Sequence, residues 1–538
     1  MEKDNKPFVV VRDDGYSPFA CYGLPYPVSD EEFLQLYVDY MTAFPDIKVK
    51  EMGCGPGYTF TYATKAGENP LFDADETALS TVRDMDIKAR SVVADFISRG
   101  TDTINLVSGR CHELGIKTWI RYEINMNLGI PAADNMPYTA FAGSFLKQHP
   151  EYRIGYDPVD APFGIGTQQD FSIEAVRDDR LKMIREFAQH EIDGVSIDFC
   201  VNPPFVSDVK TGAPILTQFI RDARRVLDEE GARRKTRIDL IARMDYDAEK
   251  YGLMWKNWVR EGLLDYIIPS VARIDDCWDV PNEEFVECCK NTSCRVLTCI
   301  RPFVNTLVWT DPQPQDHKSG VTREDERMTK EQLYAKAYAG LANGADGVEI
   351  AIATGGLTDT RPINEKDEYR RDGWRDVYAK LGDIEYLKAR DKEYSFNNNQ
   401  GLPAHLTAEE PKLKLTMRIP DEPGDIKRAV LVLHGRGLTP YENIMLRING
   451  HGLMLTEKEL NWASYDAPIL TGKELPRMLL FRIKEWWNIC RNEISVPVEF
   501  LKKGINRFEF EYRVKGNVLL KNKDYAFGRV SLKLKIED

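Results

Sequence analysis

Histidine is scarce in this sequence, with seven residues among 538, and none falls on the inward face of a predicted strand. A histidine-based metal site and a serine–histidine–aspartate triad are therefore poorly supported. The ten cysteines form neither a CxxC pair nor the cysteine–histidine spacing of a zinc site. We therefore predict no metal and mostly buried, free thiols. Pairing of Cys288 or Cys289 with Cys294 stays open, because spacing alone does not decide it.

The chain also lacks long apolar runs and basic runs. No segment approaches the roughly 20 apolar residues of a membrane-spanning helix, so we expect no membrane partner. The net charge of −13 argues against nucleic acid, although a local group of arginines could still bind an anionic small ligand. The start, MEKDNKPFVV, has no apolar signal-peptide segment. The compartment stays open, with export to the periplasm or exterior and removal of a signal peptide as one alternative.

One segment combines a buried strand with a carboxylate. Residues 193–204 have the sequence DGVSIDFCVNPP, in which apolar residues alternate with Ser196 and Asp198. A carboxylate at the last inward position of a buried strand is costly unless it is paired or used. An amphipathic helix at 176–190 precedes this strand and a Pro-Pro loop follows it. Such a strand is typical of those that end at the catalytic face of a (β/α)8 barrel.

Eight short apolar segments, separated by helical segments, give the count and order of a (β/α)8 TIM barrel. We expect its strands at 8–12, 47–52, 117–125, 193–198, 237–245, 265–273, 295–301 and 347–353. After Phe396 the chain changes character, with a polar run at 397–401 and then alternating segments separated by turn residues. We therefore predict a catalytic barrel domain at 1–396 and an accessory, carbohydrate-binding-like antiparallel β-sandwich at 397–538.

The ends of the predicted barrel strands carry many charges. They are Arg12, Arg121, Glu123, Asp198, Arg243, Asp245, Arg273, Asp275, Asp276, Arg301 and Glu349. A single inward charge is more often part of an internal ion pair than a catalyst. Five arginines and several acids on one face nevertheless indicate a functional site, because reacting groups of such barrels lie at these strand ends. No lysine lies there as a Schiff-base nucleophile.

Carboxylate chemistry remains. Two carboxyl groups flanking a glycosidic bond act as acid and as nucleophile or base. We predict Asp198 as the functional carboxylate, with Glu349 and Glu123 competing as its partner and Asp245 and Asp276 behind them. The predicted substrate-binding residues are Arg121, Asn125, Arg243, Arg273, Arg301, Asp276, Trp278 and Trp309. Trp119, Trp278, Trp309 and the tyrosines of the loop at 127–170 would offer flat apolar faces on which sugar rings stack.

The arginines have two interpretations. They could hold the acids ionised by lowering their pKa values, or they could bind a uronate or sulfate group of the substrate, where bidentate geometry favours arginine over lysine. Five arginines exceed what two catalytic acids need, which favours the second interpretation.

Three segments resemble the glycoside-hydrolase-like barrels related to family 10: VRDD at 176–179, DGVSIDFCVNPP at 193–204 and WVREGLLDYIIP at 258–269. The resemblance spans about residues 8–353 and implies a TIM barrel that hydrolyses carbohydrate. Asp198 matches the family's strand-four carboxylate, and Phe199 stands where a second acid often follows it. The region after 396 is similar to the β-sandwich modules that accompany many polysaccharide-degrading barrels.

The same stretch resembles the DGxDxDxE signature of family 18 chitinases. Ser196 stands where an aspartate belongs and Cys200 where the catalytic glutamate belongs, so a substrate-assisted mechanism of that type is not expected. The leading hypothesis is a glycoside hydrolase acting without a cofactor on an oligo- or polysaccharide, acidic glycans included. The alternatives are a non-catalytic carbohydrate-binding protein with a degenerate site and a barrel lyase acting on an anionic sugar. The oligomeric state stays open.

Overall fold

The structure is a computed structural model that divides into two compact units. The described residues are 6–13, 15–20, 26–55, 60–80, 82, 84–127, 140–154, 168–271, 280–301, 303–309, 321–350, 377–396, 404–406, 410–436, 442–455, 489–514 and 525–537. The first unit consists of Met1–Ile274, Val280–Arg301 and Asn343–Gly382. The second consists of Asp275–Asp279, Pro302–Ala342 and Asp383–Asp538.

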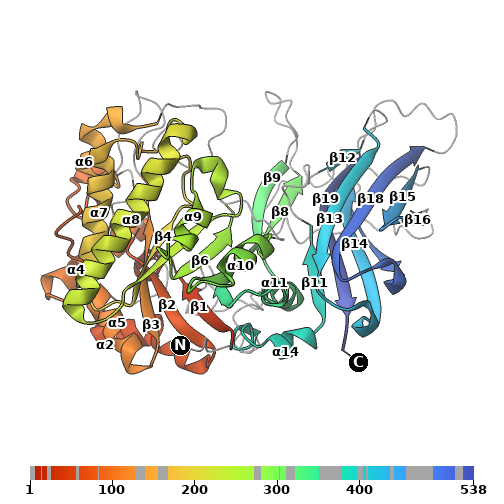
Figure 1. Ribbon diagram of the computed structural model, residues 1–538, viewed down its shortest axis with the longest axis horizontal. Coiled ribbons are helices and arrows are strands. Elements are labelled where there is room, and N and C mark those ends of the chain that lie inside the picture. Colours follow the sequence, from red (N-terminus) through yellow and green to blue (C-terminus); the bar gives the residue numbers. More distant parts are fainter. Residues whose placement is uncertain are drawn as a thin grey trace. The chain divides into compact units, whose positions relative to one another are not determined.

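A closed barrel of eight parallel strands forms the first unit (Figure 1). Its strands are β1 (Phe8–Arg12), β2 (Ile47–Gly53), β3 (Lys117–Glu123), β4 (Gly194–Asp198), β5 (Asp239–Asp245), β6 (Tyr266–Ser270), β7 (Arg295–Ile300) and β10 (Gly347–Ile350). β10 pairs with both β7 and β1 and so closes the ring. The predicted TIM barrel is confirmed, and each of the eight predicted segments coincides with one of these strands to within a few residues at its ends. Residues 351–353 and 272–273, which were expected to extend two of them, lie outside the described residues.

Helices alternate with the barrel strands along the chain. In the first unit they are α1 (Ser17–Ala20), α2 (Asp30–Tyr37), α3 (Glu76–Leu79), α4 (Asp84–Ser98), α5 (Thr103–Glu113), α6 (Ser144–Gln148), α7 (Glu174–Gln189), α8 (Val209–Arg234), α9 (Trp255–Arg260) and α10 (Glu283–Cys289). Short 3₁₀ turns lie at Asp39–Ala43, Pro150–Tyr152 and Ala248–Tyr251. Among the helices of the described residues, none is long and apolar enough to span a bilayer.

Part of the barrel interior is apolar and tightly packed. It contains Phe8, Val10, Val49, Trp119, Ile241, Ile268, Leu297 and Cys299. Gly194, the first residue of β4, gives this cluster room: a Cβ atom there would lie 2.6 Å from Trp119 Cδ1 and 2.9 Å from Ile241 Cδ1. The glycine is therefore required by the packing of the large indole ring beside it.

Gly194→Ala is expected to lower the free energy of unfolding by about 1–3 kcal/mol, because the added methyl group overpacks the core. Gly109→Ala is the matched control: Gly109 lies inside α5, and its Cβ would meet no atom within 4 Å. That variant is expected to gain up to about 1 kcal/mol, since alanine favours the helix over glycine. Urea unfolding measures both, and equal stability of Gly194→Ala and wild type would contradict the packing argument.

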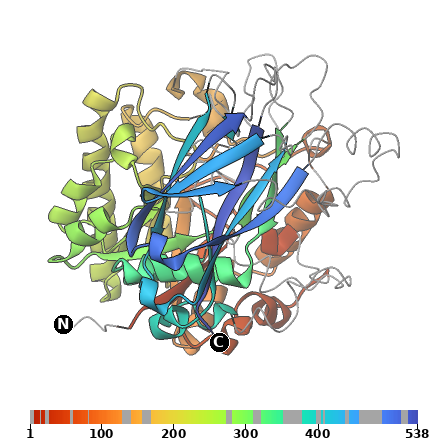
Figure 2. The same cartoon turned by 90° about the vertical axis from the view of Figure 1, so that its right-hand side faces the viewer.

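The second unit contains two antiparallel sheets, and the predicted β-sandwich is confirmed (Figure 2). One sheet contains β11 (Lys392–Ser395), β12 (Ala404–Leu406), β14 (Arg428–Arg436), β17 (Ile489–Val496) and β19 (Tyr525–Lys535). The other contains β13 (Lys412–Ile419), β15 (Glu442–Ile448), β16 (His451–Leu455) and β18 (Gly504–Val514). The unit also holds the hairpin of β8 (Phe303–Trp309) and β9 (Val321–Arg327), helices α11 (Lys330–Ala342) and α14 (Ile384–Lys388), and the 3₁₀ turns Pro423–Asp425 and Val498–Phe500.

The division differs from the expected one at residue 396. β11 precedes the polar run at 397–401 and pairs with β19, so the chain has already entered the sandwich before that run. The second unit also includes the β8–β9 hairpin and α11. Within the sandwich, β17 ends at Val496, because Pro497 has no N–H to donate to the ladder.

Candidate active site

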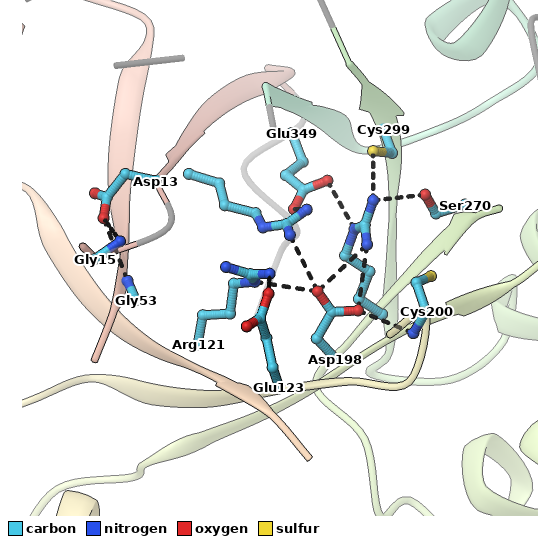
Figure 3. A network of polar contacts seen from close by, with 12 residues as sticks. Asp13, Gly15, Gly53, Arg121, Glu123, Asp198, Cys200, Ser270, Cys299 and Glu349 are labelled. Carbon is cyan, nitrogen blue, oxygen red and sulfur yellow. Dashed lines mark hydrogen bonds and ion pairs between the residues drawn. The ribbon is translucent and has the colours of Figure 1, made fainter. Parts of the chain in front are cut away.

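Asp198 is the last residue of β4 and faces the barrel interior, fully buried. Three guanidinium groups surround its carboxylate (Figure 3): Arg12 Nη2 lies 3.1 Å away, Arg121 Nε 3.1 Å and Arg243 Nη1 3.2 Å. The backbone N–H of Cys200 also donates to Asp198 Oδ1 at 2.9 Å. Asp198 is thus the common anion of strands β1, β3 and β5.

The charge state of Asp198 follows from these contacts. Burial, the largest single influence, raises the pKa of a carboxyl group. The three arginines, with Arg243 the strongest and Arg12 and Arg121 next, outweigh it and hold the pKa of Asp198 well below its usual range. Asp198 is therefore ionised at neutral pH.

Glu349 joins the same network from β10. It is fully buried, and its carboxylate lies 3.6 Å from Arg12 Nη1 and 3.5 Å from Arg243 Nε. Burial again opposes the shift, but Arg243 and Arg12 lower the pKa of Glu349. Arg12 and Arg243 therefore each contact both Asp198 and Glu349, and they hold these two carboxylates at one end of the barrel.

Glu123 and Asp245, the two other predicted catalytic acids, do not share the contacts of Asp198 and Glu349 with both Arg12 and Arg243. Glu123, at the end of β3, forms an ion pair with Arg121 and is partly exposed. Through Arg121 it is linked to Asp198. Asp245, at the end of β5, accepts a hydrogen bond from Asp247 N at 2.8 Å and lies 3.6 Å from Lys250 Nζ.

Among the predicted substrate-binding residues, the two arginines on β3 and β5 are engaged by the chain itself. Arg243 also donates to Ser270 Oγ at 2.7 Å and to Cys299 Sγ at 3.4 Å. Arg121 and Arg243 thus contact acids of the chain itself, which favours the interpretation that the arginines hold these acids ionised.

The remaining predicted residues are placed as follows. Asn125 is buried and bridges backbone segments: it donates to the carbonyls of Asn202 and Pro204, both at 3.3 Å, and accepts from Gln169 N. Arg301 is partly exposed directly after β7, and Trp309 is the last residue of β8. Arg273, Asp275, Asp276 and Trp278 lie outside the described residues.

Sequence reasoning missed Glu51, an inward residue of β2 that is fully buried beside this network. Burial and the charge of Glu349 raise the pKa of Glu51 to about 8. The alternation of Val49, Glu51 and Gly53 along β2 is the signal that could have found it. The neighbouring Lys50 points the other way and binds Asp13 at 2.7 Å.

In the part of the chain that the structure describes, no group of three or more histidine, cysteine, aspartate or glutamate side chains is arranged to hold a metal ion. The polar chemistry of this site is that of carboxylates and guanidinium groups.

Neither a protein-family model nor a curated protein sequence matches the chain. Solved structures of glycoside hydrolases from several families are among those similar to it. A family 27 β-L-arabinopyranosidase from Geobacillus stearothermophilus is 12% identical, with 96% of this chain and 98% of that chain covered and a TM-score of 0.38. A putative α-L-fucosidase from Bacteroides thetaiotaomicron is 10% identical, with coverage of 99% and 97% and a TM-score of 0.31.

A family 18 N-acetylglucosaminidase from Paenibacillus barengoltzii is 10% identical, with 70% of this chain and 99% of that chain covered and a TM-score of 0.37. Membership of the family 10-related group stays a prediction. The assignment of a TIM barrel with a β-sandwich rests on the closed ring of eight parallel strands and the two antiparallel sheets themselves.

Proposed function

We propose that this protein is a glycoside hydrolase that cleaves O-glycosyl bonds of an oligo- or polysaccharide, with Asp198 and Glu349 as its paired carboxylates. The observation that supports this proposal is the shared contact of Arg12 and Arg243 with both acids. It fixes two carboxylates together at the strand ends, where barrel enzymes carry their reacting groups.

The roles follow from the arginine contacts. Asp198 serves as nucleophile or base, because three arginines stabilise its negative charge. Glu349 is the acid partner, favoured over Glu123 and Asp245 because two arginines join it to Asp198. Since those arginines also lower the pKa of Glu349, it needs a proton source before it can protonate a leaving oxygen.

The test is hydrolysis of aryl glycosides and oligosaccharides by wild type, Asp198→Asn and Glu349→Gln. Both variants are expected to lose at least about 10²–10⁴-fold in kcat. Asp239→Asn is the control: Asp239 opens β5 at the opposite end of the barrel and lies 3.3 Å from Lys117 Nζ. Its kcat should match wild type. Circular dichroism checks that each variant is folded, and full turnover by folded Asp198→Asn would refute the assignment.

The arginines bear on the proposed substrate charge. Because Arg12, Arg121 and Arg243 each contact a carboxylate of the chain, a uronate or sulfate group would compete with these carboxylates. We include acidic glycans among the proposed substrates and test them by comparing the turnover of acidic and neutral oligosaccharides. Faster turnover of the acidic members would support their inclusion, and equal turnover would remove it.

A carbohydrate-binding protein without turnover is the second candidate. The observation that favours it is the complete burial of Asp198 and Glu349 in ion pairs within the chain. Calorimetric titration with the same oligosaccharides separates the two candidates. Binding without product from any glycan would support the binding protein, and product formation that needs Asp198 would support the hydrolase.

A further inference from the structure

Glu51 and Glu349 are two buried carboxyl groups that enter the barrel on either side of β1, which pairs with both β2 and β10. Among the described residues, no hydrogen bond of good geometry reaches either oxygen of Glu51 or of Glu349, although the Ser196 hydroxyl lies near Glu51, and the Cys299 thiol and Glu51 itself lie near Glu349. A buried acceptor without a donor is costly. One proton shared by the two groups would remove this cost, because it turns one carboxyl oxygen into a donor for the other.

The charges of the cluster lead to the same conclusion. Among the described residues, its three cations are the side chains of Arg12, Arg121 and Arg243, and its four carboxyl groups are those of Glu51, Glu123, Asp198 and Glu349. With all four ionised, the barrel would enclose one uncompensated negative charge. An unpaired charge in the interior is so unfavourable that the group takes up a proton instead.

Glu51 is the group that takes it up. Glu123, Asp198 and Glu349 each form ion pairs with arginine, whereas Glu51 forms none among the described residues. The other cation near β2, Lys50, is on the opposite face of the strand and is paired with Asp13.

We infer that Glu51 holds a proton at neutral pH and shares it with Glu349, and that Glu51 thereby acts as a positioning residue and proton source for the carboxylate pair. The effect of burial and of Glu349, which together raise the pKa of Glu51 to about 8, agrees with this arrangement, although Arg12, Ser196 and Arg121 oppose the shift. The catalytic part of the inference rests on the proposed function, and the protonation part does not.

The proton balance of the reaction is closed. Glu51 gives its proton to Glu349, and Glu349 gives a proton to the leaving oxygen as the glycosidic C–O bond breaks with its electron pair on that oxygen. With Asp198 as nucleophile, its carboxylate bonds to the anomeric carbon as that C–O bond breaks. Water then attacks the anomeric carbon and displaces Asp198 as a carboxylate. The remaining proton of the water returns through Glu349 to Glu51, so that the site is restored without a further reactant.

Glu51→Gln tests the protonation, since glutamine keeps the size of the side chain and a donor toward Glu349. In wild type the folded protein keeps this proton, while the unfolded chain loses it above the ordinary glutamate pKa of 4.5. The unfolding equilibrium constant of wild type relative to Glu51→Gln should therefore rise about tenfold per pH unit from 4.5 to about 8 and then level off. Urea unfolding at a series of pH values, with hydrogen exchange of β2 reporting on the barrel, measures this ratio.

Glu229→Gln is the control, because Arg185 and Arg225 lower the pKa of that exposed glutamate. Its stability difference from wild type should be constant above pH 4.5 and should disappear as the pH falls below that value. The difference infrared spectrum of wild type and Glu51→Gln should also contain the carbonyl band of a protonated carboxyl group at neutral pH. A missing band, or a stability difference that changes with pH only below 4.5, would overturn the inference. If band and slope are found but wild type hydrolyses no glycan, the proton assignment holds and the proposed function fails. If wild type is active, Glu51→Gln should lower kcat at neutral pH; unchanged kcat would refute the proton-source role.

Discussion

Replacement of Asp198 by alanine is expected to destabilise the barrel by at least about 3–5 kcal/mol, the usual cost of leaving a buried charge without its partner. Arg12, Arg121 and Arg243 all contact this carboxylate, and all three lie almost fully inside the barrel. Without Asp198, three guanidinium groups would face only Glu123 and Glu349 as ionised partners. The cluster would then carry an excess positive charge inside the barrel.

The measurement is the denaturant midpoint of the barrel, with hydrogen exchange of β4 and β5 as the local reporter. The matched control removes a cation together with the anion. The double variant Asp198→Ala with Arg121→Met should be more stable than Asp198→Ala alone, because it restores the charge balance and leaves an apolar side chain of similar length. Wild-type stability of Asp198→Ala would show that these ion pairs do not support the fold.

The inward direction of Asp198 could be predicted from the sequence, whereas its partners could not. Alternation along β4 indicates that Ser196 and Asp198 face inward, and the structure agrees. The identity of the partners depends on the tilt of the strands in the closed ring. Arg12 meets Asp198 although 186 residues separate them, and β1 and β4 are not neighbours in the barrel. The charged strand ends include both residues, but sequence alone does not pair them.

Glu51 was missed for a related reason. Charged strand ends are the sequence signal for reacting groups in a barrel, and Glu51 lies two residues before the end of β2. It matters because of Glu349, which reaches the same interior from β10. The sequence likewise indicates a sandwich after the barrel, but it cannot show that β11 pairs with β19, about 140 residues later. Local pattern fixes which face a side chain occupies, and ring closure and strand pairing decide what it meets.

Lys50→Met is expected to lower the free energy of unfolding by about 3–5 kcal/mol, because it too leaves a buried charge, here that of Asp13, without its partner. Lys50 and Asp13 are both fully buried, with Lys50 Nζ 2.7 Å from Asp13 Oδ2 and 4.0 Å from the centre of the Tyr37 ring. Asp13 Oδ1 accepts hydrogen bonds from Gly15 N at 2.7 Å and Gly53 N at 3.4 Å. This carboxylate therefore ties the end of β2 to the residues that follow β1.

Asp13→Asn provides the test of mechanism in the same background. The amide keeps an oxygen for the two backbone donors and carries no charge, so Lys50→Met with Asp13→Asn should recover much of the loss seen in Lys50→Met alone. Denaturant midpoints of wild type, the two single variants and the double variant give the coupling free energy, and additive losses would contradict the ion-pair explanation.

Because Asp13 directly follows Arg12, Lys50→Met should also displace Arg12 from Asp198 and Glu349. A Lys50→Met variant that stays folded should therefore lose activity along with stability, while the double variant regains both.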